Sequence, residues 1–141
     1  MAFDPNEITK LIRDSMNDVD NIKNAVEGNI YSHYINSNSD FPCITNHILG
    51  GSLHFANNVC EPIIQSRIWT SNDKNPSGFL YDVYKYIYAE FFNTYKSNSI
   101  LHLEISMKRL STLPAVMQES YKNNEIYSLP FNLHCRAIFK T

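Results

Sequence analysis

The chain has 141 residues, of which 43% are hydrophobic, and its formal net charge at pH 7 is −2. This length is typical of one globular domain, residues 1–141, and the apolar content suffices for a core, which excludes a disordered composition. Because 12 Lys and Arg stand against 14 Asp and Glu, the basic excess typical of nucleic-acid-binding proteins is missing. We therefore expect no nucleic-acid partner.

The sequence has no recognisable export or membrane signal. Residues 1–20 carry acids and lack the basic start and apolar centre of a secretory signal. No uninterrupted apolar run reaches about 18 residues, so no transmembrane segment is predicted. The three cysteines, Cys43, Cys60 and Cys135, are too few and too widely spaced for a disulfide framework. We expect an intracellular, cytoplasmic protein with reduced thiols.

The N-terminal region predicts a helix over residues 5–35. Asp4 and Pro5 are typical of a helix start, and Gly28 is a weak point within the pattern. Turn-forming residues at 36–42 end it. Spacings of three or four, which indicate an amphipathic helix, separate the apolar residues Ile8, Ile12, Met16, Val19, Ile22, Val26, Ile30 and Tyr34.

A second helix is predicted over residues 44–68, although Gly50, Gly51 and Pro62 weaken it. Its apolar stripe covers more than half of the helical wheel, as expected of a central, heavily buried helix. The members of this stripe are Ile44, Ile48, Leu49, Leu53, Phe55, Ala56, Val59, Cys60 and Ile63.

A third helix is predicted over residues 78–96, after a linker at 70–78 that has no apolar side chain in its TSNDKNPSG sequence. Its aliphatic stripe must be core. The adjoining aromatic stripe fits either packing against the rest of this chain or a protein interface, where tyrosine is enriched. The predicted interface residues are Tyr81, Tyr84, Tyr88, Phe92 and Tyr95.

The C-terminal part alternates apolar and polar residues, which is typical of half-buried strands. Strands are predicted over 100–107, where a helix also fits, and over 127–139, with a short helix at 113–123 between them. The predicted fold class is therefore α+β and predominantly helical. Three amphipathic helices precede a small C-terminal β-α-β or hairpin-like unit.

Metal and catalytic chemistry find little support in the sequence. Cys43 and His47 have the i, i+4 spacing that lets two helical side chains reach one ion, and His54 follows two turns later. Cys60 falls on the opposite side of the helical wheel, so four ligands do not converge. Cys43, His47 and His54 stay low-ranking candidates, and neither a catalytic set nor a cofactor is predicted.

The leading functional hypothesis is a non-enzymatic protein–protein interaction protein, either a homodimer or a small structural subunit of a larger assembly. It rests on the aromatic stripe and on a two-stranded sheet, which is marginal by itself in water. One alternative is a small metal-binding protein or enzyme that uses Cys43, His47 and His54. Another is a viral or parasite factor that binds a host protein, suggested by the wide apolar stripe of residues 44–63.

Overall fold

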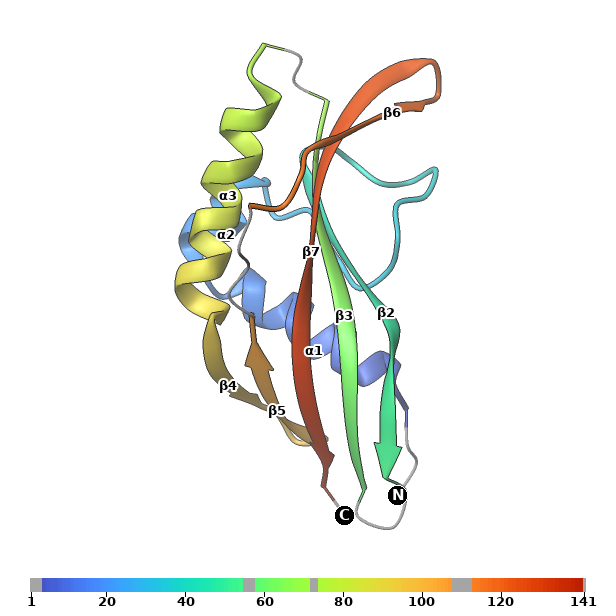
Figure 1. Cartoon of the computed structure of the whole chain (residues 1–141), viewed down its shortest axis with the longest axis vertical. Coiled ribbons are helices and arrows are strands. Elements are labelled where there is room, and N and C mark those ends of the chain that lie inside the picture. Colours follow the sequence, from blue (N-terminus) through green and yellow to red (C-terminus); the bar gives the residue numbers. More distant parts are fainter. Residues whose placement is uncertain (1–3, 55–57, 72–73, 108–112, 141) are drawn as a thin grey trace.

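A computed structural model of the protein describes residues 4–54, 58–71, 74–107 and 113–140, apart from the side chains of residues 53 and 54. Strands predominate over helices in these residues (Figure 1). The elements follow in the order α1 (Asn6–Asn17), α2 (Asp20–Ala25), β1 (Ile30–Tyr31), β2 (Cys43–His54), β3 (Val59–Thr70), α3 (Pro76–Phe91), β4 (Asn93–Ser97), β5 (Leu101–Ser106), β6 (Met117–Tyr121) and β7 (Asn124–Phe139).

The strands form one sheet in the order β1-β2-β3-β7-β5-β4, and β6 pairs with β7 beside this path. Paired strands are antiparallel, except for the short parallel pair of β1 with β2. One edge of β7 pairs with β3, and its other edge pairs with β6 near the start of β7 and with β5 near its end. The long strand β7 therefore joins the β2–β3 hairpin to the β4–β5 hairpin.

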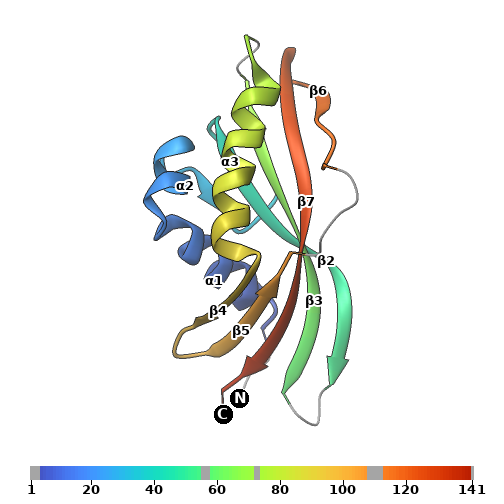
Figure 2. The same cartoon turned by 60° about the vertical axis from the view of Figure 1, so that its left-hand side comes forward.

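The three helices lie on one face of the sheet and enclose the main core (Figure 2). The odd-numbered residues of β7 from Leu129 to Phe139 point to this face and are at most 6% exposed. Ile64 of β3 and Leu103 of β5 share this face and are fully buried. Since each fully buried aliphatic side chain contributes about 1.5–3 kcal/mol, this face provides most of the driving force for folding.

Among the described residues, a loop covers the opposite face of the sheet at the end where β6 pairs with β7. Residues 32–42, called the strap below, cross it there: the Tyr121 hydroxyl donates to the carbonyl oxygen of Asn36 at 2.6 Å, and Lys122 Nζ donates to that of Ser37 at 3.0 Å. Below the strap lies a second, smaller cluster of buried residues, Cys43, Trp69 and Ile126.

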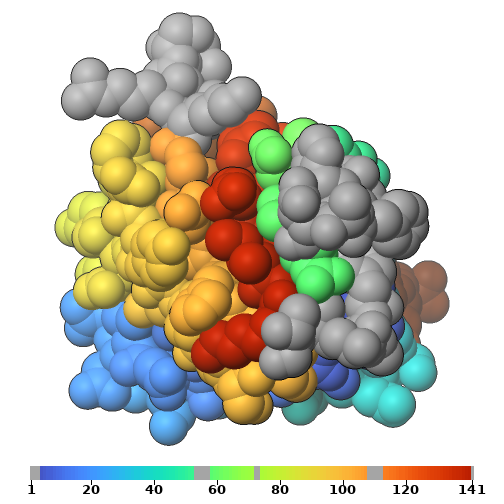
Figure 3. All heavy atoms as spheres, turned by 90° about the horizontal axis from the view of Figure 1, so that it is seen from below, coloured from blue at the N-terminus to red at the C-terminus, as the bar shows by residue number. Residues whose placement is uncertain are grey.

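Figure 3 looks at the opposite end of the molecule, where the C-terminal end of β7 lies between the β4–β5 hairpin and β3, with the N-terminal helices along one side. None of the helices among the described residues has the length and apolarity that a membrane crossing requires.

The predominantly helical fold class is wrong, chiefly because residues 44–54 and 59–68 lie in the paired strands β2 and β3 instead of a helix. A strand that is buried along much of both faces gives a nearly continuous apolar run, which a helical wheel reads as a wide stripe. The bulge between Ile48 and Gly50 shifts the alternation further. Gly51 has a φ of +140°, and a Cβ there would lie 2.3 Å from the carbonyl oxygen of Glu61, so the backbone of β3 approaches too closely for a side chain.

The helix predicted over 5–35 is two shorter helices followed by a two-residue strand. α1 ends at Asn17, and after α2 the chain turns through Glu27 and Gly28, whose φ values of +55° and +76° are incompatible with a right-handed helix. The apolar periodicity nevertheless identified buried residues, because the stripe continues across both breaks. Its buried members include Ile8, Ile12, Met16, Ile22, Val26 and Ile30.

Two further helix boundaries differ from the prediction. α3 begins after Asn75, whose side-chain Oδ1 accepts from the Gly78 N–H at 3.2 Å, and it ends at Phe91 instead of residue 96 because β4 pairs with β5.

The helix predicted over 113–123 is wrong: β6 occupies 117–121. Lys122 and Asn123, with φ of +49° and +65°, form the tight turn that joins it to β7. The predicted strands at 100–107 and 127–139 lie where β5 and β7 are found.

Candidate functional site

The uncovered part of the sheet face opposite the helices is the candidate site, called the open face below. Even-numbered residues of β7 point to it: Ser128 is buried near the strap, whereas Asn132 and Arg136 are exposed. The strand register places side chains of β5 and β4 in rows beside those of β7. One such row runs Tyr95, Glu104, Arg136, and the next runs Asn93, Ser106, His134.

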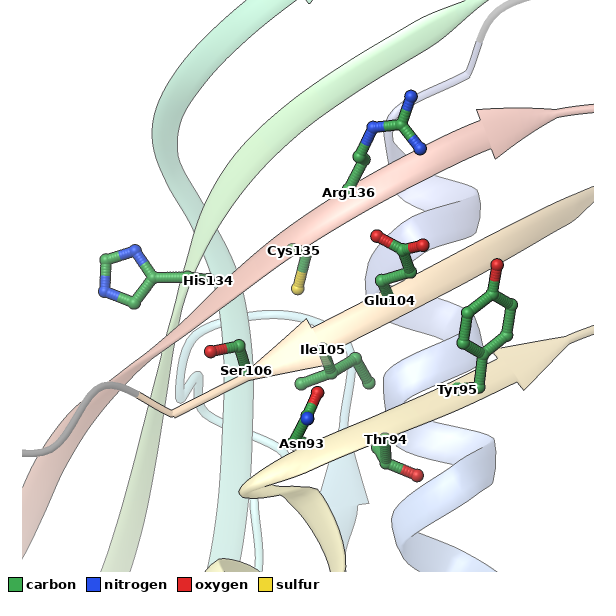
Figure 4. Close-up of a pocket in the computed structure, with 9 residues that line it drawn as sticks. All are labelled: Asn93, Thr94, Tyr95, Glu104, Ile105, Ser106, His134, Cys135 and Arg136. Carbon is green, nitrogen blue, oxygen red and sulfur yellow. The ribbon is translucent and has the colours of Figure 1, made fainter.

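A recess of about 770 Å³ lies over these rows. Figure 4 shows Tyr95, Glu104 and Arg136 rising from the same side of β4, β5 and β7, while the Cys135 thiol points the other way, toward the core. Amide, hydroxyl, imidazole, carboxylate and guanidinium groups all line the recess. A surface of this kind binds a polar ligand or a partner's side chains by hydrogen bonds and ion pairs.

Charged groups of both signs stand side by side in this recess. Glu104 and Arg136 are register partners on β5 and β7, yet neither side chain makes a hydrogen bond or an ion pair within the part of the chain that the structure describes. Tyr95 beside them is 61% exposed. The row thus presents an exposed aromatic ring, a carboxylate and a guanidinium, all available to another molecule.

Arg67 of β3 lies where the open face meets the strap. Its Cζ is 5.1 Å from the ring centroid of Trp69 and 5.8 Å from that of Tyr34, and the two rings meet edge-on at 5.6 Å, so the guanidinium lies beside a pair of contacting aromatic rings. Nη1 donates to the Tyr34 hydroxyl at 3.3 Å and to Glu119 Oε1 at 3.4 Å, and Nη2 donates to Gln65 Oε1 at 3.4 Å. Only 11% of the Arg67 side chain is exposed.

Three buried polar atoms near Arg67 have no partner among the described residues: Arg67 Nε, His47 Nδ1 and Ser128 Oγ. Burial lowers the pKa of His47 below its ordinary value, and the positive charge of Arg67 lowers it further. His47 is therefore neutral at pH 7. An unpaired buried polar atom costs about 1–3 kcal/mol and is rare in native proteins, so three in one neighbourhood mark this cluster as unusual.

The predicted interface residues separate into two groups. Tyr81, Tyr84, Tyr88 and Phe92 lie along one flank of α3, where neighbouring rings form a ladder: 6.1 Å separates the centroids of Tyr84 and Tyr88, and 5.1 Å those of Tyr88 and Phe92. The Tyr84 ring also meets Phe131 of β7 edge-on at 5.2 Å. Part of the aromatic stripe thus packs against this chain's own C-terminal strand.

The ends of this ladder differ in their surroundings. The Tyr81 hydroxyl donates to the carbonyl oxygen of Pro114, whereas Phe92 is 37% exposed. Tyr95 does not belong to the ladder, because it lies on β4 and points to the open face. A continuous surface of all five residues is therefore not formed.

The structure separates the metal-ligand candidates. Cys43 and His47 lie four residues apart on the strand β2, about 13 Å at 3.3 Å per residue, instead of one helical turn. His54 is a further seven residues along β2, and its side chain lies outside the described part. Among the described residues, no group of three His, Cys, Asp or Glu side chains is placed to hold a metal ion.

The three thiols are buried. Burial, with a smaller contribution from the negative charge of Asp40, raises the pKa of Cys43 to about 12, and burial together with the neighbouring Cys60 raises that of Cys135 to about 12. Burial also raises the pKa of Cys60. Because the thiolate is the nucleophile and the metal ligand, these residues behave as core side chains.

The alternation of apolar and polar residues in the predicted strands 100–107 and 127–139 puts Glu104, His134 and Arg136 on polar faces, but the sequence analysis missed Arg67 and Trp69. One face of β3 carries residues 63, 65, 67 and 69, which alternate with the residues of the other face. This period of two was overlooked because residues 44–68 were interpreted as a helix. The combination of β-branched residues with Gly50 and Gly51 was the available signal for a bulged strand in this segment.

Comparison with known proteins adds no assignment. No protein-family model matches this sequence, and no curated protein matches it significantly.

Proposed function

We propose that this protein is a non-enzymatic interaction protein that forms a homodimer through the open face of its sheet. The observation that carries the proposal is the row of Tyr95, Glu104 and Arg136, which projects from one face without internal ion pairs. The helical face supports no comparable role, because its apolar side chains are already packed in the core.

A second copy of this chain fits the charge pattern of the row. In a twofold symmetric interface the same patch of both subunits meets, so residue i contacts residue j and j contacts i. A twofold axis between Glu104 and Arg136 brings each carboxylate to the guanidinium of the other copy. The row is thus self-complementary, since it contains one group of each sign at neighbouring positions.

Tyr95 supplies what the charged pair lacks, an exposed aromatic surface. Tyrosine and arginine are enriched among the residues that dominate binding energies, because they combine a large contact area with hydrogen bonding. With 61% of its surface exposed at the end of the row, Tyr95 is placed to pack against the partner subunit beside the ion pairs.

Self-association is tested by analytical ultracentrifugation of the whole chain over a wide concentration range. We expect a monomer–dimer equilibrium that Tyr95→Ala weakens while its unfolding midpoint changes little. The matched control is Tyr86→Ala, a partly buried tyrosine of α3 outside the open face. A strictly monomeric protein at several hundred micromolar would contradict the proposal, and so would equal weakening by both variants.

A further inference from the structure

We propose that Arg67 binds the carboxylate group of a small organic acid through the Nε and Nη2 edge of its guanidinium. The site lies near the strap, apart from the proposed dimer interface. Of the five N–H donors of the guanidinium, those on Nη1 and one on Nη2 have acceptors, whereas the Nε donor has none.

The bonds that Arg67 makes are long, and one edge is free. Its contacts to Tyr34, Glu119 and Gln65 measure 3.3–3.4 Å, beyond the 2.7–3.2 Å of a good N–H···O hydrogen bond. Both Nη1 donors are directed to Tyr34 and Glu119, whereas Nη2 has one donor to spare and Nε has no partner. A carboxylate meets such an edge with two parallel hydrogen bonds of about 2.7–2.9 Å.

Two further unpaired groups lie on the strands that flank Arg67. Arg67 is the register partner of Thr45 on β2 and of Pro130 on β7, so His47 and Ser128, each two residues along, are its diagonal neighbours on the same face. His47 lies toward Gln65 and Ser128 toward Trp69, so the two are on opposite sides of Arg67. Since diagonal neighbours are within reach of a long side chain, one of them, the imidazole Nδ1 or the hydroxyl, can add a hydrogen bond to an oxygen held by Arg67.

The walls of the site favour a ligand that also has an apolar part. Trp69, which is fully buried, and Tyr34 of the strap, which is 43% exposed, both have ring centroids within 5.8 Å of the Arg67 Cζ. Entry of the ligand requires the Tyr34 ring to turn away. This turn breaks one 3.3 Å hydrogen bond and the edge-on ring contacts of Tyr34 with His47 and Trp69.

Trp69 is the single tryptophan of the chain, so its fluorescence reports directly on the site. The probes are benzoate and benzamide, which have nearly the same shape, but only benzoate carries the charge. Because a charge-assisted hydrogen bond is roughly twice as strong as a neutral one, we expect benzoate to bind at least about tenfold more tightly, which corresponds to about 1.4 kcal/mol. The measurement is a titration of wild-type protein with each compound, excited at the red edge of tryptophan absorption.

Arg67→Lys tests the role of the planar guanidinium, since lysine keeps the positive charge but cannot make two parallel hydrogen bonds to a carboxylate. We expect this variant to lose the benzoate response, while Arg13→Lys on α1 retains it. If Arg67→Lys does not fold, the comparison of benzoate with benzamide on wild-type protein still decides. An equal response to both compounds, no saturable response, or a benzoate affinity unchanged in folded Arg67→Lys would overturn the proposal.

Discussion

Ile64 of β3 and Leu133 of β7 lie directly opposite each other in the antiparallel register, and both side chains are fully buried. This pair lies at the centre of the sheet, in the region where the periodicity of residues 44–68 indicated a helix. Leu49, a member of the predicted helical stripe, is instead 52% exposed at the bulge of β2. The buried Ile64 and the exposed Leu49 therefore distinguish the two paired strands from the predicted helix.

Replacing Ile64 by alanine is expected to lower the free energy of unfolding by about 2–5 kcal/mol, because it leaves a cavity in the main core. Leu49→Ala, the matched control, is expected to change it by about 0.5 kcal/mol or less, as exposed substitutions usually do. Chemical denaturation followed by Trp69 fluorescence measures both. The reverse order of effects would contradict the sheet register.

The stability of the protein is expected to fall on acidification because of His47. Its pKa is lowered in the folded state, so between its folded pKa and its ordinary value of about 6.5 the unfolded state binds more protons than the folded state. The contribution of His47 to the free energy of unfolding is complete above this pH range and is lost as the pH falls through it. Unfolding free energies of wild type and His47→Gln, measured from pH 7.5 to pH 5, test this. An identical pH dependence of the two proteins would show that His47 does not contribute.

The cysteines are expected to react slowly in the folded protein. With the pKa of Cys43 and of Cys135 raised to about 12, almost no thiolate exists at pH 8, and burial blocks access as well. Ellman's reagent should modify all three thiols of the chain rapidly in denaturant and only at the rate of opening in buffer. A fast stoichiometric reaction in the native state would instead support the alternative of a catalytic or metal-binding thiol.

In segments with a strong local periodicity, the buried face could be predicted from the sequence, whether or not the type of element was predicted correctly. The core side of α3, Leu80, Val83, Ile87 and Phe91, is buried as the 3.6-residue period indicated. The alternation of 127–139 likewise identified the face of β7 that carries Arg136. In both cases one face of the element is buried and the other is open, so the pattern has a single period.

The hairpin of β2 and β3 could not be recognised in the same way, because its two faces are both partly covered. The helices cover Ile64 on one side, and the strap covers Trp69 on the other, so polar residues do not alternate cleanly. The position of the strap depends on contacts between residues more than 80 positions apart, such as Tyr121 with Asn36. The surroundings of Arg67 follow from this tertiary arrangement and not from any local motif.

The proposed dimer requires opposite charges at Glu104 and Arg136, the two central positions of its interface. In the twofold arrangement Glu104→Arg places two guanidinium groups opposite each other, and Arg136→Glu places two carboxylates opposite each other. Like charges in contact are destabilising, so each variant alone should dimerise at least about tenfold more weakly, a change of about 1.4 kcal/mol. Lys85→Glu on the exposed side of α3 is the control for a change of net charge.

The most direct measurement mixes these two variants in equal amounts and determines the molecular mass by sedimentation equilibrium. Each subunit then meets a partner of opposite charge at both contacts, so we expect the mixture to form a heterodimer at concentrations where each variant alone is a monomer. Circular dichroism confirms that both variants are folded. A mixture that stays as monomeric as its components, or variants that dimerise as well as wild type, would contradict an interface built on Glu104 and Arg136.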